Sequence, residues 1–232
     1  MNFRGNLQSL NKLDMLSFVF VFAVVIGGVV TSQIDRLLYE GTYAVEDGLV
    51  EWLSVLALSL GSITNFYRAY ILKPFRSKRF IIMLTLLGGL FLFGFLEEIS
   101  YGQRIIGFES PAFFKEHNTQ MEFNLHNLKF GEARINKLIF GTFLGICIVI
   151  YFLIMPFIYC KKEQVKNFVD GLALPVPKWF HIGAYLLLAL LAEFIASEKK
   201  GEILEFGGCW IFFLMTVRPY NREVFSRRSL NY

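Results

Sequence analysis

Six apolar stretches alternate with shorter polar segments along the chain. Each is close to the length of about 20 residues that an α-helix needs to cross a bilayer. The stretches cover residues 15–33, 48–72, 80–98, 138–159, 179–196 and 202–217. The pattern predicts an all-α fold, a polytopic bundle of about six transmembrane helices that forms one transmembrane domain over residues 1–232.

The composition agrees with this prediction. Hydrophobic residues make up 55% of the 232 residues, 26 residues are Phe, and the mean hydropathy is +0.49. Soluble domains do not carry such long uncharged runs. No small-x-small cleavage site follows the first stretch, so we expect a retained helix rather than a signal peptide. We expect membrane lipid around the protein and no nucleic-acid partner.

Lys and Arg concentrate on one side of the predicted membrane. With six crossings and a cytoplasmic N-terminus, residues 1–14, 68–79, 160–178 and 218–232 face the cytoplasm. These segments hold 15 Lys and Arg against 4 Asp and Glu, a net +11, and the rest holds 8 against 15, a net −7. Basic loops stay in the cytoplasm. We therefore expect a multi-pass protein of a bacterial inner membrane with both termini cytoplasmic.

The opposite, outer face gathers carboxylates from several predicted helix ends. Ionisable groups at this depth are costly and usually find partners inside the protein. Packed carboxylates need Arg, a metal ion or protons to offset their repulsion. Their convergence predicts a site at the outer leaflet, although solvated interfacial residues are an alternative. The carboxylates are Asp47, Glu51, Glu97, Glu98, Glu202 and Glu205.

The polar connection over residues 99–136 is the longest in the chain. Ser110 and Pro111 favour a helix start, with Ser as the N-cap and Pro at the first helical position. Phe113 and Phe114 follow, which predicts a short interfacial helix. Loops of this length are usually functional or disordered.

After this helix, the apolar residues of the segment that follows favour a return toward the third predicted transmembrane helix. This return would bring His126 to the end of that helix, within about 10 Å of Glu97 or Glu98. A hydrogen-bonded structural histidine is the alternative interpretation.

Candidate roles follow from side-chain chemistry. Glu97 or Glu98 would be the general base and His126 the second acid/base group. Arg104 would hold an anionic group such as phosphate, or only tie the loop to a carboxylate. Glu51, Glu97 and His126 could bind a divalent cation, for which Mg, Mn or Ca fits better than Zn. Further substrate-binding candidates are Ser100, Tyr101, Gln103, Asn124 and Asn127.

Three motifs carry a resemblance. They are EDGLVEW at 46–52, LEEISYGQR at 96–104 and NLHN at 124–127. In these motifs the chain resembles a family of uncharacterised bacterial multi-pass inner-membrane proteins, with Tyr101 where that family more often has Trp. The resemblance covers about residues 45 to 130, and it implies a membrane bundle but no activity.

Three functions stay open on the sequence. The first is a hydrolase or transferase that acts on a lipid or lipid-linked envelope substrate. The second is a non-enzymatic assembly or signalling subunit that binds a membrane-protein partner through its outer loop. The third is a proton- or cation-coupled transporter, which is disfavoured because the predicted acidic groups stop at one face of the membrane.

Overall fold

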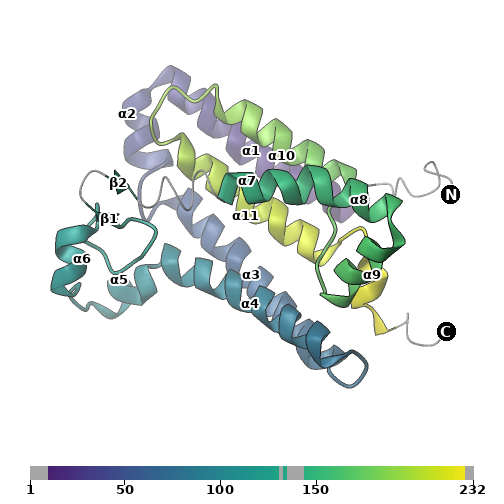
Figure 1. Ribbon diagram of the computed structural model, residues 1–232. Helices are drawn as coiled ribbons and strands as arrows, with labels where there is room; N and C mark the ends of the chain where they lie inside the picture. The colour runs from purple at the N-terminus through teal and green to yellow at the C-terminus, as the bar shows by residue number, and fades with distance from the viewer. Residues whose placement is uncertain (1–9, 131–132, 135–143, 228–232) are drawn as a thin grey trace.

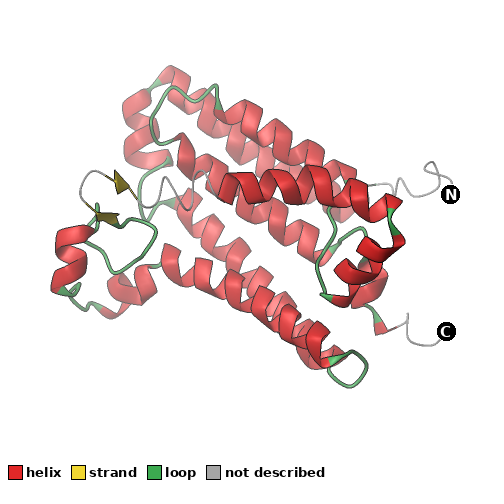
Figure 2. Ribbon diagram, viewed as in Figure 1, coloured by secondary structure: helices red, strands yellow, loops and turns green. Residues whose placement is uncertain are grey.

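The computed structural model describes residues 10–130, 133–134 and 144–227, and the regular structure in these residues is almost entirely helical (Figures 1 and 2). A two-residue hairpin of β1 (Lys129–Phe130) and β2 (Ala133–Arg134) is antiparallel. The predicted all-α class is therefore confirmed.

Among the described residues, three helices are long and apolar enough to cross a membrane. They are α1 (Lys12–Ile34), α3 (Leu49–Leu72) and α4 (Lys78–Glu98), and they coincide with the first three predicted stretches. These three helices are therefore compatible with the first part of the predicted membrane bundle. The count of about six spans is not confirmed by length and composition alone.

The fourth predicted stretch begins outside the described residues. Its described part is continuous helix, formed by α7 (Leu144–Val149), a π-helical turn η4 (Ile150–Ile154) and α8 (Met155–Lys161). The last two stretches correspond to α10 (Trp179–Ala192) and α11 (Lys200–Val217).

Helix α10 ends earlier than the sequence predicts. Beyond α10, backbone groups of the chain form hydrogen bonds with side chains at the end of α1. Ser32 Oγ accepts the Ala196 N–H at 3.2 Å, and Gln33 Nε2 donates to the Phe194 carbonyl oxygen at 2.5 Å. The apolar run therefore predicted a longer helix than the structure has.

The helices form two groups that meet along α11. Helices α1, α10 and α11 lie together, and α3 and α4 form a long antiparallel hairpin beside them (Figure 1). Within the hairpin, Gly61 allows close approach, since a Cβ there would lie 2.4 Å from Phe91. Trp210 Nε1, from α11, donates to the Leu53 carbonyl oxygen at 3.1 Å and fixes α11 against α3.

Short elements complete the fold at both ends of the bundle. At the end that holds the outer loop are α2 (Arg36–Leu38), the π-helix η1 (Tyr39–Tyr43), η2 (Ser100–Gly102), α5 (Gln103–Ile106) and α6 (Ala112–His117). At the other end are α9 (Glu163–Gly171) and η5 (Arg222–Phe225). The start of α1 and the end of α11 lie at this second end (Figure 1).

The outer loop contains the predicted short helix, but its cap differs. Pro111 takes the N-cap position of α6 and makes no side-chain cap bond. Ser110 is buried instead, with its Oγ 2.7 Å from the Met121 carbonyl oxygen and 3.1 Å from Gln103 Oε1. The predicted Ser110 N-cap is wrong because the hydroxyl holds the returning segment.

Candidate functional site at the outer end of α4

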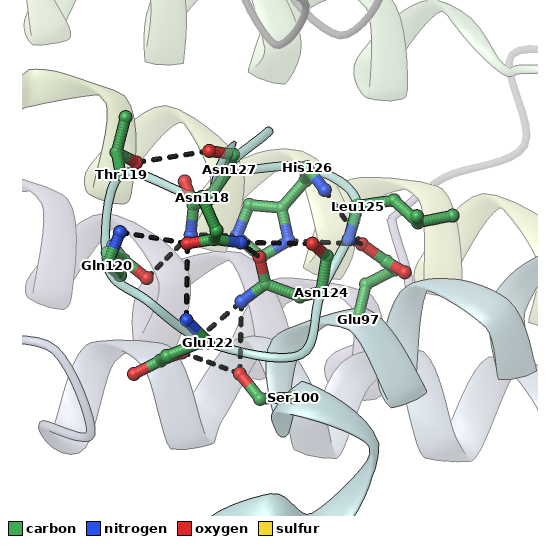
Figure 3. Close-up of polar contacts among 10 residues, drawn as sticks. All are labelled: Glu97, Ser100, Asn118, Thr119, Gln120, Glu122, Asn124, Leu125, His126 and Asn127. Carbon is green, nitrogen blue, oxygen red and sulfur yellow. Dashed lines mark hydrogen bonds and ion pairs between the residues drawn. The ribbon is translucent and has the colours of Figure 1, made fainter. Parts of the chain in front are cut away.

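Glu97, in the last turn of α4, is the centre of a polar site. It is only 3% exposed, and its Oε2 accepts the backbone N–H of Leu125 at 2.7 Å and that of His126 at 2.9 Å. Charge-assisted bonds of this kind are roughly twice as strong as neutral ones. One carboxylate thus holds the returning loop against the helix end (Figure 3).

His126 lies beside this carboxylate, as the sequence predicts. Its Nδ1 is 3.4 Å from Glu97 Oε2, and its side chain is 30% exposed. Burial lowers the pKa of His126. The contact with Glu97 and the charges of Glu205 and Glu202 raise this pKa by more than burial lowers it, so the pKa of His126 lies above its ordinary value. The arrangement therefore favours proton uptake at this ring.

A chain of amides continues from the other side of the ring. Asn127 Nδ2 lies 3.1 Å from His126 Nε2 and donates to Gln120 Oε1 at 2.6 Å, while Gln120 Nε2 donates to Glu46 Oε1 at 2.5 Å. With the amides in this direction, Nε2 accepts and Nδ1 carries the proton. Protonation of Nε2 requires Asn127 to present its Oδ1 instead.

A second network holds the loop on itself. Ser100 Oγ donates to Glu122 Oε2 at 2.6 Å, and Asn124 Nδ2 donates to Ser100 Oγ at 3.0 Å. Asn118 Nδ2 donates to Asn124 Oδ1 at 2.7 Å. Ser100, Asn118 and Asn124 are all buried. Their polar atoms therefore order the loop, and substrate binding by Ser100 and Asn124 stays a prediction.

The turn after α4 contains three consecutive residues with left-handed backbone conformation. Ser100, Tyr101 and Gly102 have φ angles of +46°, +52° and +78°. Burial, followed by the interaction with Glu97, raises the pKa of Tyr101 to about 12, which keeps this phenol neutral. Gln103 Oε1 accepts the Phe123 N–H at 2.8 Å, so Gln103 also holds the loop.

Carboxylates from three helices converge beside this loop, as predicted. The carboxyl groups of Glu98 and Glu205 lie within hydrogen-bonding reach of each other, and Glu51 and Glu202 act on Glu98 through their charges. Glu51, Asp47 and Glu98 also line a cavity of about 20 Å³. Contact between two carboxyl groups requires a proton or a cation to offset the repulsion.

The expected metal ligands are not assembled. Among the described residues, no three His, Cys, Asp or Glu side chains are arranged to hold a metal ion. Glu97 Oε2 is occupied by backbone N–H groups, and Glu51 Oε2 accepts the Asp47 N–H at 2.6 Å. The structure therefore does not bring Glu51, Glu97 and His126 together as a three-ligand metal site: His126 contacts Glu97, whereas Glu51 bonds to the backbone of Asp47.

The predicted contact of Arg104 with at least one carboxylate lies outside the described side chains. The carboxylates that the sequence offers as partners for Arg104 are Glu51, Glu97, Glu98, Glu202 and Glu205. That contact stays a prediction.

Sequence reasoning missed the contacts of Asn118, Gln120 and Glu122, and that of Glu46 with Gln120. A usable signal was present. Polar Gln120, Glu122 and Asn124 alternate with apolar residues, which places them on one face of an extended segment.

No protein family, curated protein or solved structure matches this chain.

Proposed function

We propose that Glu97 and His126 form the acid/base centre of a membrane hydrolase or transferase that acts on a lipid or lipid-linked envelope substrate. The observation that carries the proposal is the contact of Glu97 Oε2 with His126 Nδ1, held in place by two backbone N–H bonds to the same oxygen. A carboxylate in this position orients an imidazole and stabilises its protonated form.

The proposed reaction uses His126 Nε2, the ring nitrogen that does not contact Glu97. Nε2 takes a proton from a water molecule or a substrate hydroxyl as that oxygen attacks the substrate at the bond to the leaving group, and Glu97 stabilises the imidazolium. The proton then passes from Nε2 to the leaving group. Asn127 must first give up its contact with Nε2, which the partial exposure of the ring allows.

The proposed membrane placement has six crossings, with both termini in the cytoplasm of a bacterial cell and the site at the outer leaflet. The net charges of +11 and −7 on the two sides support this orientation. The position of the start of α1 and the end of α11 at one end of the bundle supports an even number of crossings (Figure 1).

The test is a lipid assay on the full-length protein. The purified protein is reconstituted in liposomes made from a bacterial envelope lipid extract, and mass spectrometry follows lipids that are consumed or formed. We expect the wild type to convert a lipid species. Glu97→Gln and His126→Gln should lose most of this conversion, because general acid/base groups typically contribute about 100-fold or more.

Phe113→Ala is the matched control, since Phe113 is exposed in the same loop and takes no part in the proposed chemistry. It should retain activity. Conversion that survives both site substitutions would refute the acid/base role, and no lipid conversion by the wild type would refute the lipid enzyme.

A non-enzymatic partner-binding subunit is the second candidate. The observation in its favour is the exposed apolar surface of the outer loop, where Ile105, Ile106 and Met121 are each more than half exposed. In that case Ile106→Asp should abolish co-purification of a membrane-protein partner, whereas His126→Gln should not.

A further inference from the structure

A second buried polar cluster lies at the opposite end of the bundle, away from the site of the proposed function. Lys178 and His181 stand at the start of α10, Arg218 follows the end of α11, and Asp14 lies in the first turn of α1. Lys178 is 5% exposed, His181 is fully buried, and the Asp14 side chain is 4% exposed. Figure 1 shows these three helix ends together.

Donors in this cluster outnumber the acceptors. His181 Nδ1 accepts the Lys178 N–H at 3.1 Å, so the ring proton of the neutral imidazole is on Nε2. This Nε2 is buried and has no hydrogen-bond partner among the described residues. Buried donors are rarely left without an acceptor.

Lys178 adds a cation at the end of a largely buried side chain. Within the described part of the chain its ammonium makes no hydrogen bond or ion pair, and its recorded contact is the face of the Phe180 ring, 5.4 Å from Nζ to the centroid. Burial of an ammonium group without an acceptor is costly. An anion in contact with Lys178 would remove that cost.

The acid in the cluster is already occupied. Asp14 Oδ2 lies 3.2 Å from Arg218 Nη1, and it also accepts the Asn11 N–H at 3.4 Å in the cap of α1. Arg218 Nη1 is an ion-pair partner of Asp14 but makes no aligned hydrogen bond to a described residue. One carboxylate thus faces two buried or half-buried cations.

The charges around Lys178 also show an excess of cations over anions in this cluster. Burial lowers the pKa of Lys178, and the charges of Arg218 and Arg222 lower it further, while Asp14 acts in the opposite direction. The surplus of positive charge is the electrostatic condition for anion binding.

We propose that Lys178, His181 and Arg218 bind a phosphate group at this end of the bundle. A tetrahedral oxyanion has enough acceptor oxygens for the Lys178 ammonium, the His181 Nε2–H and the Arg218 guanidinium, whereas the cluster itself supplies only Asp14. The group is either the phosphodiester of an anionic lipid headgroup or a free phosphate. Exposed Trp179 and Leu16 beside the cluster place it next to the lipid-facing surface.

The experiment uses the full-length protein in two arms. In the first, inorganic phosphate is titrated into detergent-solubilised protein, and thermal unfolding is followed at constant ionic strength. In the second, the protein is placed in nanodiscs of phosphatidylcholine with or without phosphatidylglycerol, and native mass spectrometry counts retained lipids. We expect the wild type to be stabilised by phosphate, to retain phosphatidylglycerol, or both.

Lys178→Gln should weaken the response about tenfold, the factor for loss of one charge-assisted contact. Lys178→Arg should restore it, because the charge and the donors return, and this variant separates binding from any folding defect. Lys162→Gln is the matched control, an exposed lysine at the same end of the bundle.

Each outcome decides the proposal. A response only to phosphate assigns a free phosphate, and a response only to phosphatidylglycerol assigns a lipid headgroup. The proposal is overturned if the wild type responds in neither arm, or if Lys162→Gln reduces the response as much as Lys178→Gln.

Discussion

The two ends of the bundle treat buried charge in opposite ways. At the outer end, Glu97 is surrounded by donors from its own chain, with two backbone N–H groups and an imidazole within reach of one oxygen. At the other end, Lys178 and His181 Nε2 have no hydrogen-bond acceptor among the described residues. At the outer end Glu97 Oε2 has three donors of the chain within reach, although Glu97 Oε1 has no partner among the described residues, whereas at the other end the groups without a partner are donors.

This difference shows how a buried charge that stabilises the fold can be distinguished from a buried charge that binds a ligand. A buried carboxylate that organises a loop stabilises the protein in the absence of any ligand. A buried ammonium without an acceptor destabilises the protein until an anion arrives. Stability measurements can therefore distinguish the two ends without knowledge of the reaction.

The proposed placement of the two ends on opposite sides of a membrane gives the largest expected effect. A reporter that is active only in the periplasm should be silent when fused after Tyr232 and fully active when inserted near Thr119. The physical reason is the charge difference between the two sides. The reverse pattern of activities would exchange the outer and inner ends and overturn the placement of the site.

Loss of the Glu97 carboxylate should give the next largest effect. Glu97→Ala leaves the N–H groups of Leu125 and His126 without their acceptor and should lower the free energy of unfolding by about 3 kcal/mol. The measurement is denaturant or thermal unfolding in detergent. Glu109→Ala removes an exposed loop carboxylate paired with Lys115 and should change little. Equal losses in both variants would contradict the structural role of Glu97.

Loss of the Lys178 charge should have a smaller effect of the opposite sign. Lys178→Met keeps the apolar stem and removes the buried ammonium, so the unfolding midpoint in phosphate-free detergent should stay the same or rise. Lys162→Met, at an exposed position, is the control. A clear loss of stability specific to Lys178→Met would show that the ammonium already has a stabilising partner, and the contrast between the ends would fail.

The smallest expected effect is a dependence of stability on pH at His126. The folded-state pKa is raised, by Glu97, Glu205 and Glu202 against the effect of burial. This stabilisation is therefore fully present below the unfolded pKa of about 6.5 and is lost as pH rises through the folded pKa. The unfolding midpoint of the wild type, compared with that of His126→Gln, should lose its advantage over this range.

His117→Gln, in α6 of the same loop, is the control for this measurement. An advantage of the wild type over His126→Gln that stays constant with pH would indicate that proton binding at His126 is not linked to folding.

Much of the fold was predictable because hydrophobic periodicity and length determine membrane helices. The first three stretches became α1, α3 and α4, since each contains a long window of high mean hydropathy with few charged residues. The end of α10 was not predictable from apolar pattern, because its next residues bond to Ser32 and Gln33, which are distant in sequence. The same apolar sequence is compatible with a further turn of helix and with a non-helical turn after α10.

The sequence predicted which residues lie in the site better than it predicted the contacts that they make. A buried glutamate and a histidine in an ordered loop were expected to meet, and His126 does contact Glu97. The direction of the contacts was not predictable, because sequence spacing does not tell which carboxylate oxygen a backbone N–H will reach. Asn124 and Ser100 thus became partners of each other rather than free groups.

The bonds from Glu97 to the loop close a ring of chain, since Glu97 and Leu125 are 28 residues apart. Closing a flexible ring of that length costs roughly 3 kcal/mol of chain entropy, which is regained each time the ring opens. The loop can therefore detach as one unit while α3 and α4 stay packed. Slow hydrogen–deuterium exchange at the amides of Leu125 and His126 would report how often that detachment uncovers the imidazole.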